Sequence, residues 1–304
     1  MSSKHSLCKD AIRQLCIEAG ACAVGFARVE PLPEEATARF EQWLASGRNA
    51  GMAYMANYAD IRSNPDLLLP GAMTLISCAF AYTSPEFRRH HLFADYALGS
   101  DYHEVLRKAL TPVAERLESD SAGTRICIDT APLRERFWAV RAGVGFMGMN
   151  NMLIVPGVGS RVFLAEILWT GELEPDASRE NETCEGCGAC MRACPGGALD
   201  GTGSVDASRC MSYLTIEHRG DLPAGLRLPG RIYGCDICQD VCPHNRNTHA
   251  ATVLESLRPR DSVMALTCDD IATMEQADFS RVFSHSAVKR AKLEGLKRNA
   301  KAKG

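Results

Sequence analysis

The residues of this chain best suited to chemistry are seven cysteines with the spacing of iron–sulfur ligands. In chain order the two runs are Cys184, Cys187, Cys190, Cys194 and Pro195, then Cys235, Cys238, Cys242 and Pro243. In the pattern C-x2-C-x2-C-x3-C-P, three close thiolates hold one four-iron cluster, and the fourth, before the proline, ligates a second cluster. Two four-iron clusters are therefore predicted, and with them the transfer of single electrons.

The second run is one cysteine short. Three residues before Cys235 stands Ile232, so the runs supply seven thiolates where two four-iron clusters need eight. Cys210, between the runs, is the best candidate for the eighth ligand. The other cysteines are predicted to act as small apolar residues far upstream, or to lie in an acidic, helix-like segment: Cys8, Cys16, Cys22, Cys78 and Cys127, and Cys268.

Crossed ligation divides the eight thiolates into two sets. The first cysteine set is Cys184, Cys187, Cys190 and Cys242, and the second cysteine set is Cys194, Cys210, Cys235 and Cys238. A disulfide framework is disfavoured because such frameworks belong to small secreted domains. Zinc explains the paired C-x2-C spacings but gives no reason for the later cysteines before proline. Clusters with a purely structural role remain an alternative.

Length and composition set the broad class. The chain has 304 residues, 46% of them hydrophobic and 23% charged, which allows two domains or one large one. Its start has no apolar signal segment, and its strongest hydrophobic run, around Leu75 to Tyr82, is too short to cross a bilayer. We therefore expect a cytoplasmic monomer without membrane contact, and fourteen cysteines fit a reducing compartment.

The net charge of −3 argues against a generally basic, nucleic-acid-coating protein, but the end of the chain is basic. Seven basic residues stand there against Glu294 alone: Lys289, Arg290, Lys292, Lys297, Arg298, Lys301 and Lys303. A solvated helix face explains such a run without any function. The alternative is a surface that contacts phosphate groups.

Apolar periodicity predicts helices alternating with strands, and hence an α/β fold that is α+β overall. Helices are expected near residues 7–16, at 34–45, at 134–142, and after a capping box formed by Asp101 and Glu104. Strands are expected at residues 21–27, 73–82, 125–128 and 162–168. The predicted domains are an α/β domain at 1–175, a ferredoxin-like two-cluster domain at 176–247, and a helical segment at 248–304.

Gly143, Gly145 and Gly148 match the G-x-G-x-x-G pattern of dinucleotide-binding loops. That loop should follow a strand and open a helix, whereas the residues before Gly143 are themselves expected to be helical. We therefore predict a turn at which the backbone passes close to other atoms.

Two upstream side chains could take part in proton or metal chemistry. Asp129 follows a predicted strand, and ligands of α/β sheets tend to bind where strands end, so its carboxyl group could deliver a proton. The alternative is a turn aspartate before Pro132 that accepts backbone hydrogen bonds. His103 could ligate a metal, although a single histidine in the first turn of a helix is more often structural.

Several segments beyond the cysteine runs resemble the epoxyqueuosine reductase family. They are Gly51-Met-Ala-Tyr-Met55 with Arg62, Tyr96-Ala-Leu-Gly-Ser-Asp-Tyr-His103, Asp129-Thr-Ala-Pro132, Arg141-Ala-Gly-Val-Gly-Phe-Met-Gly148, Cys210-Met-Ser-Tyr-Leu-Thr-Ile-Glu-His218 and Arg231-Ile-Tyr-Gly-Cys-Asp-Ile-Cys-Gln-Asp-Val-Cys-Pro-His-Asn245. The last two are far more specific than a cluster motif alone. The resemblance spans most of residues 1–250.

The resemblance implies that two four-iron clusters pass electrons to a base-off cobalamin in the α/β domain. The implied reaction reduces an epoxide on a modified guanine at the wobble position of tRNA. Asp129 then becomes the general acid, with a pKa that burial would raise. The candidates to line the cobalamin pocket are Arg62, Tyr102, His103, Ser212 and Asp236, and His103 is not expected to ligate cobalt. The implied partners are the tRNA anticodon stem-loop carrying epoxyqueuosine and an electron donor.

The chain departs from the family in two places. Met149 follows Gly148 where members usually carry lysine, and the chain stops at Gly304 without the helical-repeat extension that helps many members hold tRNA. The basic tail is expected to substitute in part. Two other function classes stay open: a related corrinoid and iron–sulfur reductase of a small molecule, such as a dehalogenase, and a ferredoxin-like electron carrier.

Overall fold

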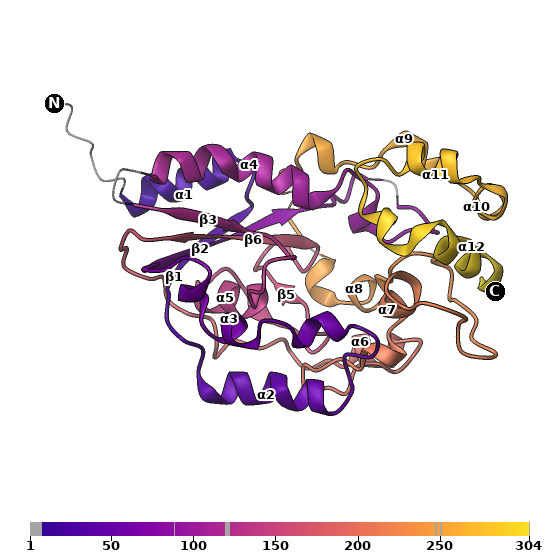
Figure 1. Cartoon of the computed structure of the whole chain (residues 1–304), viewed down its shortest axis with the longest axis horizontal. Coiled ribbons are helices and arrows are strands. Elements are labelled where there is room, and N and C mark those ends of the chain that lie inside the picture. The colour runs from indigo at the N-terminus through magenta and orange to yellow at the C-terminus, as the bar shows by residue number, and fades with distance from the viewer. Residues whose placement is uncertain (1–7, 88, 119–121, 247, 250, 304) are drawn as a thin grey trace.

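A four-stranded antiparallel sheet forms the centre of the first half of the chain (Figure 1). The computed structural model describes residues 8–87, 89–118, 122–246, 248–249 and 251–303. The sheet has the order β1-β2-β6-β3, with bounds β1 Ala23–Arg28, β2 Thr74–Ala81, β3 Thr124–Cys127 and β6 Val162–Trp169. Each strand lies within two residues of its predicted position, so the predicted strands are confirmed.

Pairing throughout this sheet is antiparallel. β2 and β6 pair along their whole lengths, from Thr74 opposite Trp169 to Ala81 opposite Val162. Every residue of β2 is buried, because helices cover both faces of the sheet. Neighbouring antiparallel strands end at opposite edges, so the sheet has no common carboxyl edge of the kind found in parallel sheets. The expectation that such an edge places Asp129 is therefore wrong.

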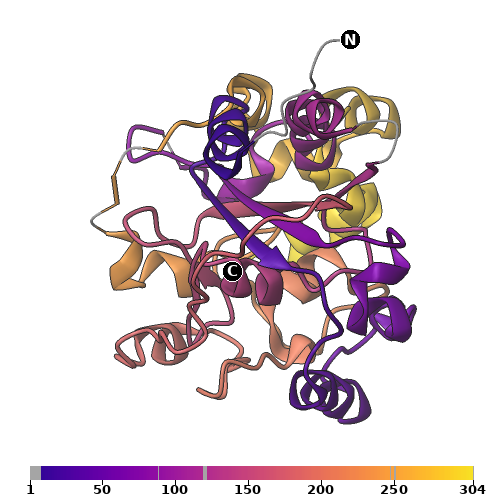
Figure 2. The same ribbon diagram turned by 90° about the vertical axis from the view of Figure 1, so that its left-hand side faces the viewer.

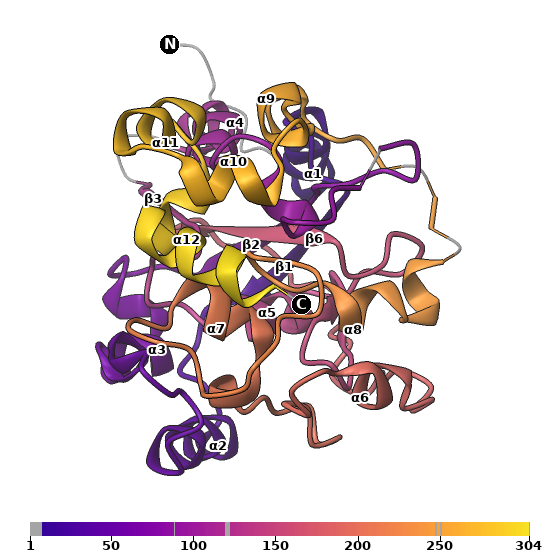
Figure 3. The same cartoon turned by 90° about the vertical axis from the view of Figure 1, so that its right-hand side faces the viewer.

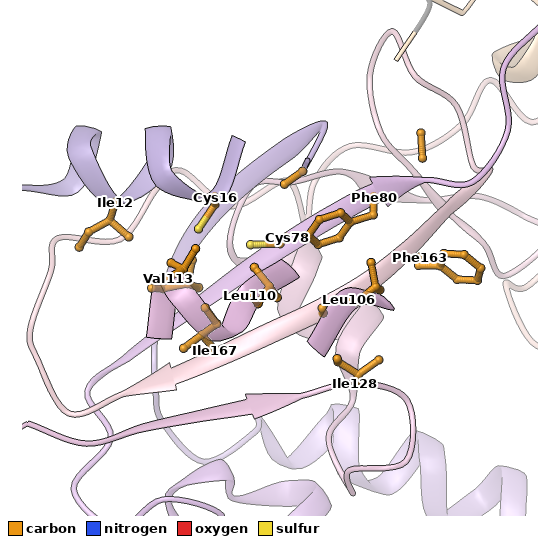
Figure 4. Close-up of a cluster of buried hydrophobic side chains, with 14 of the residues drawn as sticks. Ile12, Cys16, Cys78, Phe80, Leu106, Leu110, Val113, Ile128, Phe163 and Ile167 are labelled. Atoms are coloured by element: carbon orange, nitrogen blue, oxygen red, sulfur yellow. The ribbon is translucent and has the colours of Figure 1, made fainter. Parts of the chain in front are cut away.

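One face of the sheet is covered by α1 (Lys9–Glu18) and α4 (Tyr102–Leu117), which lie side by side (Figure 2). Ile12 and Leu110 project from these helices into a core that includes Ile167 (Figure 4). Leu7, which was predicted to begin the first helix, lies outside the described residues. Cys16 and Cys78 are buried in this core as predicted, whereas Cys8 is exposed.

The opposite face packs on α5 (Glu135–Arg141), whose Trp138 is fully buried. Beyond α5 the chain forms a small ribbon, β4 (Phe146–Met147) with β5 (Leu153–Ile154). The helix α2 (Glu34–Ala45) lies where it was predicted but has no buried residue. It contacts the cluster segment, residues 176–247, through Trp43. The indole N–H of Trp43 donates to the carbonyl of Val205 at 2.7 Å. The short helix α3 (Ala59–Ser63) follows.

The predicted glycine turn is confirmed. Gly143 follows α5 with φ +77°, and a Cβ atom there would lie 2.5 Å from the carbonyl oxygen of Ala177. At Gly145 a Cβ atom would lie 2.4 Å from the carbonyl oxygen of Ile154. These glycines therefore allow close backbone approach after a helix, and they do not open a helix as a dinucleotide loop would.

The cluster segment and the helical end of the chain share a core (Figure 3). The helices of the two parts are α6 (Ala189–Ala193), α7 (Met211–Ile216), α8 (Ile237–Asp240), α9 (Asp261–Met264), α10 (Cys268–Thr273), α11 (Gln276–Val282) and α12 (Lys292–Ala302). Leu92, Ile232 and Val263, one from each predicted domain, are buried together in this core. Among the described residues, no helix is long and apolar enough to cross a membrane.

Candidate active site

The first cysteine set lies around one hollow. Cys184, Cys187, Cys190 and Cys242 all line it, and it encloses about 380 Å³ of empty space that opens to solvent. Burial raises the pKa of Cys242, and the neighbouring thiols of Cys190, Cys187 and Cys184 raise it further. Cys187 is exposed, so this site lies at the surface.

The second cysteine set is also assembled by the fold. Burial raises the pKa of Cys238 to about 12, and Cys235, Cys210 and Cys194 add to the effect. Cys210 thus lies among the thiols with which crossed ligation places it. Within the described part of the chain, no three histidine, cysteine or acidic side chains converge on a single metal ion. A four-iron cluster is larger than an ion, and its ligands surround it.

Backbone amides already point at sulfur atoms in both sets. The N–H of Met149 donates to Cys184 Sγ at 3.4 Å, and the N–H of Ala198 donates to Cys194 Sγ at 3.3 Å. Hydrogen bonds to sulfur and nearby charge are among the factors that set a cluster's reduction potential. Met149, the residue that replaces the lysine usual in the family, therefore lies beside the first cysteine set.

We expect Met149→Lys to raise the reduction potential of the cluster held by the first cysteine set. A cation beside the cluster favours its reduced, more negative state. Redox titration followed by electron paramagnetic resonance measures this potential. Met149→Leu is the matched control and should leave it unchanged, and an unchanged potential in the lysine variant would contradict the placement of Met149.

The basic tail is partly structural, which corrects the expectation of a wholly solvated face. Arg298 donates to the carbonyls of Leu214, His218 and Gly220 at 2.7–2.9 Å. The fully buried Asn299 donates to the carbonyls of Thr215 and Ile232, both at 2.8 Å. Thr215 belongs to α7, which begins just after Cys210, and Ile232 shortly precedes Cys235. Through Asn299, α12 therefore holds in place the segments that carry these two cysteines of the second set.

Asn299→Ala should cost about 1–3 kcal/mol of stability, because two buried carbonyls lose their donor. We expect a lower melting temperature and early loss of iron from the second cysteine set on heating. Lys297→Ala, on the same helix and only half-buried, is the control. Equal melting temperatures for the two variants would contradict the bracing role.

Asp129 lies just beyond β3 in a left-handed backbone conformation, with φ +48°. Its N–H donates to Glu135 Oε1, and its Oδ2 lies 3.1 Å from His103 Nε2. His103 belongs to the first turn of α4, where Asp101 is the N-cap residue. The turn after β3 and the start of α4 therefore place this carboxylate.

The predicted capping box is only half formed. Asp101 accepts the N–H of His103 at 3.0 Å, as an N-cap residue does. Glu104 does not reach back, because the N–H of Asp101 donates to the carbonyl of His285 instead. The Glu104 carboxylate lies 2.8 Å from His285 Nδ1.

The expected rise in the pKa of Asp129 is wrong. Burial acts to raise it, but the hydrogen bond and charge of His103 outweigh that effect, with help from Tyr102 and Arg290. The pKa of Asp129 therefore lies below its ordinary value. Burial lowers the pKa of His103, yet its bonds to Asp101 and Asp129 raise it to about 9. The proton of this pair consequently resides on the histidine.

The aromatic and charged residues around Asp129 form what we call the Asp129 recess: Tyr54, Tyr102, His103, Asp129 and Arg290. The side chain of Asp129 is 56% exposed although burial has the largest influence on its pKa. Asp129 therefore stays accessible to solvent within this group of side chains. Arg290 is fixed there by a bidentate pair with Glu217, 2.7 Å for both bonds.

The other three predicted cofactor contacts, Arg62, Ser212 and Asp236, lie in different surroundings. Arg62 lies within electrostatic range of Tyr54, at the edge of the recess. Ser212 is half-buried in α7, two residues beyond Cys210. Asp236 has only 2% exposed surface, and its carboxylate accepts the N–H of Asp95 at 2.8 Å. Its side chain is therefore shielded from solvent, and its contact with the cofactor stays a prediction.

Sequence reasoning missed four residues at this site: Tyr54, Glu135, Glu217 and Arg290. Burial raises the pKa of Glu135 to about 8, and the charge of Asp129 adds to the effect. Tyr54, Asp129, Glu217 and Arg290 are far apart in the chain, and only tertiary packing joins them. Tyr54 and Glu217 do fall inside two of the segments that carry the family resemblance, which was the one available signal.

Two family models match the chain. Residues 62–130 match "Epoxyqueuosine reductase QueG, DUF1730", and residues 183–245 match "4Fe-4S double cluster binding domain". The epoxyqueuosine reductase of Leadbetterella byssophila is 37% identical over 95% of this chain and 95% of its own length. That of Pseudomonas aeruginosa is 35% identical over 93% of this chain and 81% of its own.

Solved structures give the same result. A selenomethionine-labelled epoxyqueuosine reductase matches with a TM-score of 0.88 and 30% identity, over 96% of this chain and 80% of that chain. An epoxyqueuosine reductase with an epoxyqueuosine-modified tRNA-Tyr stem loop matches with a TM-score of 0.87 and 30% identity, over 96% and 79%.

The fold and the two cysteine sets define the class of this protein as an iron–sulfur oxidoreductase, with a double-cluster 4Fe-4S domain beside an antiparallel sheet domain. The sequence relatives and the matching family model identify one family within that class. The chain belongs to the epoxyqueuosine reductase family.

Proposed function

We propose that this protein reduces epoxyqueuosine to queuosine at the wobble position of tRNA. The observation that carries the proposal is the pairing of the Asp129 carboxylate with the His103 imidazole, in a fold that also assembles both cysteine sets. Family membership supports the same substrate, since a 30% identical relative has been solved with an epoxyqueuosine-modified stem loop. The protein is proposed to work in the cytoplasm as a monomer.

The eight cysteines are proposed to hold two four-iron clusters. The first set lies at the surface with Cys187 exposed, where an electron donor can approach. The second set has no exposed thiol, and burial raises the pKa of Cys235 to about 11. α7 begins next to Cys210 and is followed by Glu217, which fixes Arg290 in the recess. Electrons would therefore pass from the surface cluster to the inner cluster and on toward the recess.

The residues at the recess fit the cobalamin that the family implies. Asp129 keeps exposed surface, and aromatic and charged side chains, among them Tyr54 and Arg290, lie within electrostatic range of it. Arg62, Tyr102, His103 and Ser212 would line the cofactor. When bound, cobalamin supplies a cobalt centre that low-potential clusters can reduce. The chain itself orients the substrate base and holds the proton that the epoxide oxygen requires.

The exposed lysines of the tail are proposed to contact tRNA phosphates. Lys289 and Lys292 are exposed and flank Arg290, whereas Arg298 is occupied with backbone carbonyls. We expect Lys289→Glu with Lys292→Glu to weaken tRNA binding and to reduce the slope of log affinity against log salt by roughly 1–2. Lys108→Glu, exposed on α4, is the control. An unchanged salt slope would contradict this contact.

The proposed function is tested directly with purified protein. Protein prepared without oxygen and supplied with cobalamin and a low-potential reductant should convert epoxyqueuosine in tRNA to queuosine, as measured by nucleoside mass spectrometry. Omitting cobalamin should abolish conversion. Protein with complete clusters and bound cobalamin that leaves epoxyqueuosine intact would contradict the proposal.

A further inference from the structure

The imidazole of His103 lies between two carboxylates. Its Nδ1 is 2.7 Å from Asp101 Oδ1, and its Nε2 is 3.1 Å from Asp129 Oδ2. An ionised carboxylate only accepts hydrogen bonds, so both ring nitrogens must carry a proton to satisfy both partners. With both carboxylates ionised, this geometry fits an imidazolium.

The position of this ring is fixed by its surroundings. Tyr102 stacks on His103 with ring centroids 4.1 Å apart, and on Phe163 of β6 with centroids 4.3 Å apart. Asp101 accepts both the backbone N–H and the ring Nδ1–H of His103, so it orients the ring as it caps α4. Nε2 is consequently aimed at Asp129, which faces the recess.

We propose that His103, oriented by Asp101, holds the proton that Asp129 delivers to the epoxide oxygen. This inference rests on the proposed function. It assigns His103 and Asp101 a role in proton supply, besides lining a cofactor pocket.

The step is balanced in atoms and electrons. The bound clusters and cofactor would supply two electrons from an external donor. One epoxide C–O bond breaks, and its oxygen takes a proton from Asp129. Asp129 has received that proton from His103 Nε2–H, and the neutral imidazole then regains a proton from water, which restores the resting pair of imidazolium and carboxylate. A second proton releases the oxygen as water and leaves the carbon–carbon double bond. The sum is an epoxide, two electrons and two protons giving an alkene and water.

Binding of the substrate base explains why the proton would move from His103 to Asp129. In the open recess water stabilises the charged pair of imidazolium and carboxylate. A bound substrate base removes that water, and separated charges become costly in a medium of low polarity. The pair then favours the neutral form, in which Asp129 carries the proton and can act as an acid.

Other charged groups near the pair have opposing effects. Glu135, from α5, accepts the N–H of Asp129 and raises its proton affinity, whereas the charge of Arg290 lowers the pKa of Asp129. Glu217 pairs with Arg290, and Tyr54 lies within electrostatic range of that arginine. His285 pairs with Glu104 and lies within electrostatic range of Asp101. His103 has a carboxylate at each ring nitrogen, so we expect the alkaline limb of activity to follow its titration.

The test has two readouts. In protein labelled with ¹⁵N-histidine and with oxidised clusters, we expect the His103 ring to titrate near 9 and its pKa to fall in Asp129→Asn. This measurement needs no turnover. In single turnover, His103→Gln should slow queuosine formation roughly 10²-fold and lose the alkaline limb.

Two further variants separate proton supply from folding. Asp101→Asn preserves the N-cap of α4, because asparagine caps as well as aspartate, and should shift the alkaline limb to lower pH. His285→Asn is the control: it removes another carboxylate-paired histidine, 71% exposed, that does not touch Asp129. We expect it to keep the wild-type rate and pH profile.

The inference is overturned if His103 titrates at an ordinary pKa of about 6.5. It is also overturned if His103→Gln keeps the wild-type rate and pH profile in an active preparation. A wild-type protein that binds epoxyqueuosine-tRNA without reducing it would instead contradict the proposed function, and the relay with it.

Discussion

Asp129→Asn is expected to slow queuosine formation by about 10²–10⁴-fold, the usual contribution of a general acid or base. The amide has the shape of the carboxyl group and can still face His103, but it cannot pass on a proton. Asparagine also tolerates the left-handed backbone at this position, φ +48°, so the turn should persist. Single-turnover assays with nucleoside mass spectrometry measure the rate.

The same variant should keep both clusters and its affinity for tRNA, because Asp129 belongs to neither cysteine set. Iron and sulfide analysis and tRNA binding check these points. Asp269→Asn, an exposed aspartate on α10, is the matched control and should retain full activity. A wild-type rate in Asp129→Asn would contradict the role of Asp129 as the general acid.

Cys210→Ser should lose the inner cluster, so that iron falls from about eight atoms per chain to about four. Cys210 is proposed to supply the ligand that the second run lacks, and its position among Cys194, Cys235 and Cys238 supports that role. Turnover should also stop, because the inner cluster connects the surface cluster with the recess. Iron analysis and electron paramagnetic resonance of the reduced protein distinguish one cluster from two.

Cys268→Ser is the matched control, because Cys268 is the other downstream cysteine outside the two runs. It begins α10 and belongs to the helical end of the chain. We expect about eight iron atoms and full activity in this variant. Loss of iron from Cys268→Ser but not from Cys210→Ser would reverse the assignment of the eighth ligand.

The grouping of the cysteines into two sets could be predicted from the sequence because their spacing is itself local geometry, and the structure brings each set together. Counting thiolates then identified Cys210, and the fold places it among the remaining ligands. Strand β2 could be predicted because a strand covered on both faces is a continuous apolar run. These features depend on residues close together in the chain.

Features that depend on tertiary packing could not be predicted. The antiparallel pairing of β2 with β6 joins segments separated by about eighty residues of chain. Arg298 has the sequence context of a solvated residue, yet the fold aims its guanidinium at three carbonyls. The pKa of Asp129 was expected to rise through burial, but a histidine from α4 lies near enough to reverse the shift.

The most direct test of the central claim is nucleoside mass spectrometry of tRNA from cells that lack this gene. We predict that epoxyqueuosine accumulates and queuosine is absent. The wild-type gene should restore queuosine, whereas the Asp129→Asn gene should not. Normal queuosine in the deletion strain, without epoxyqueuosine, would contradict the account.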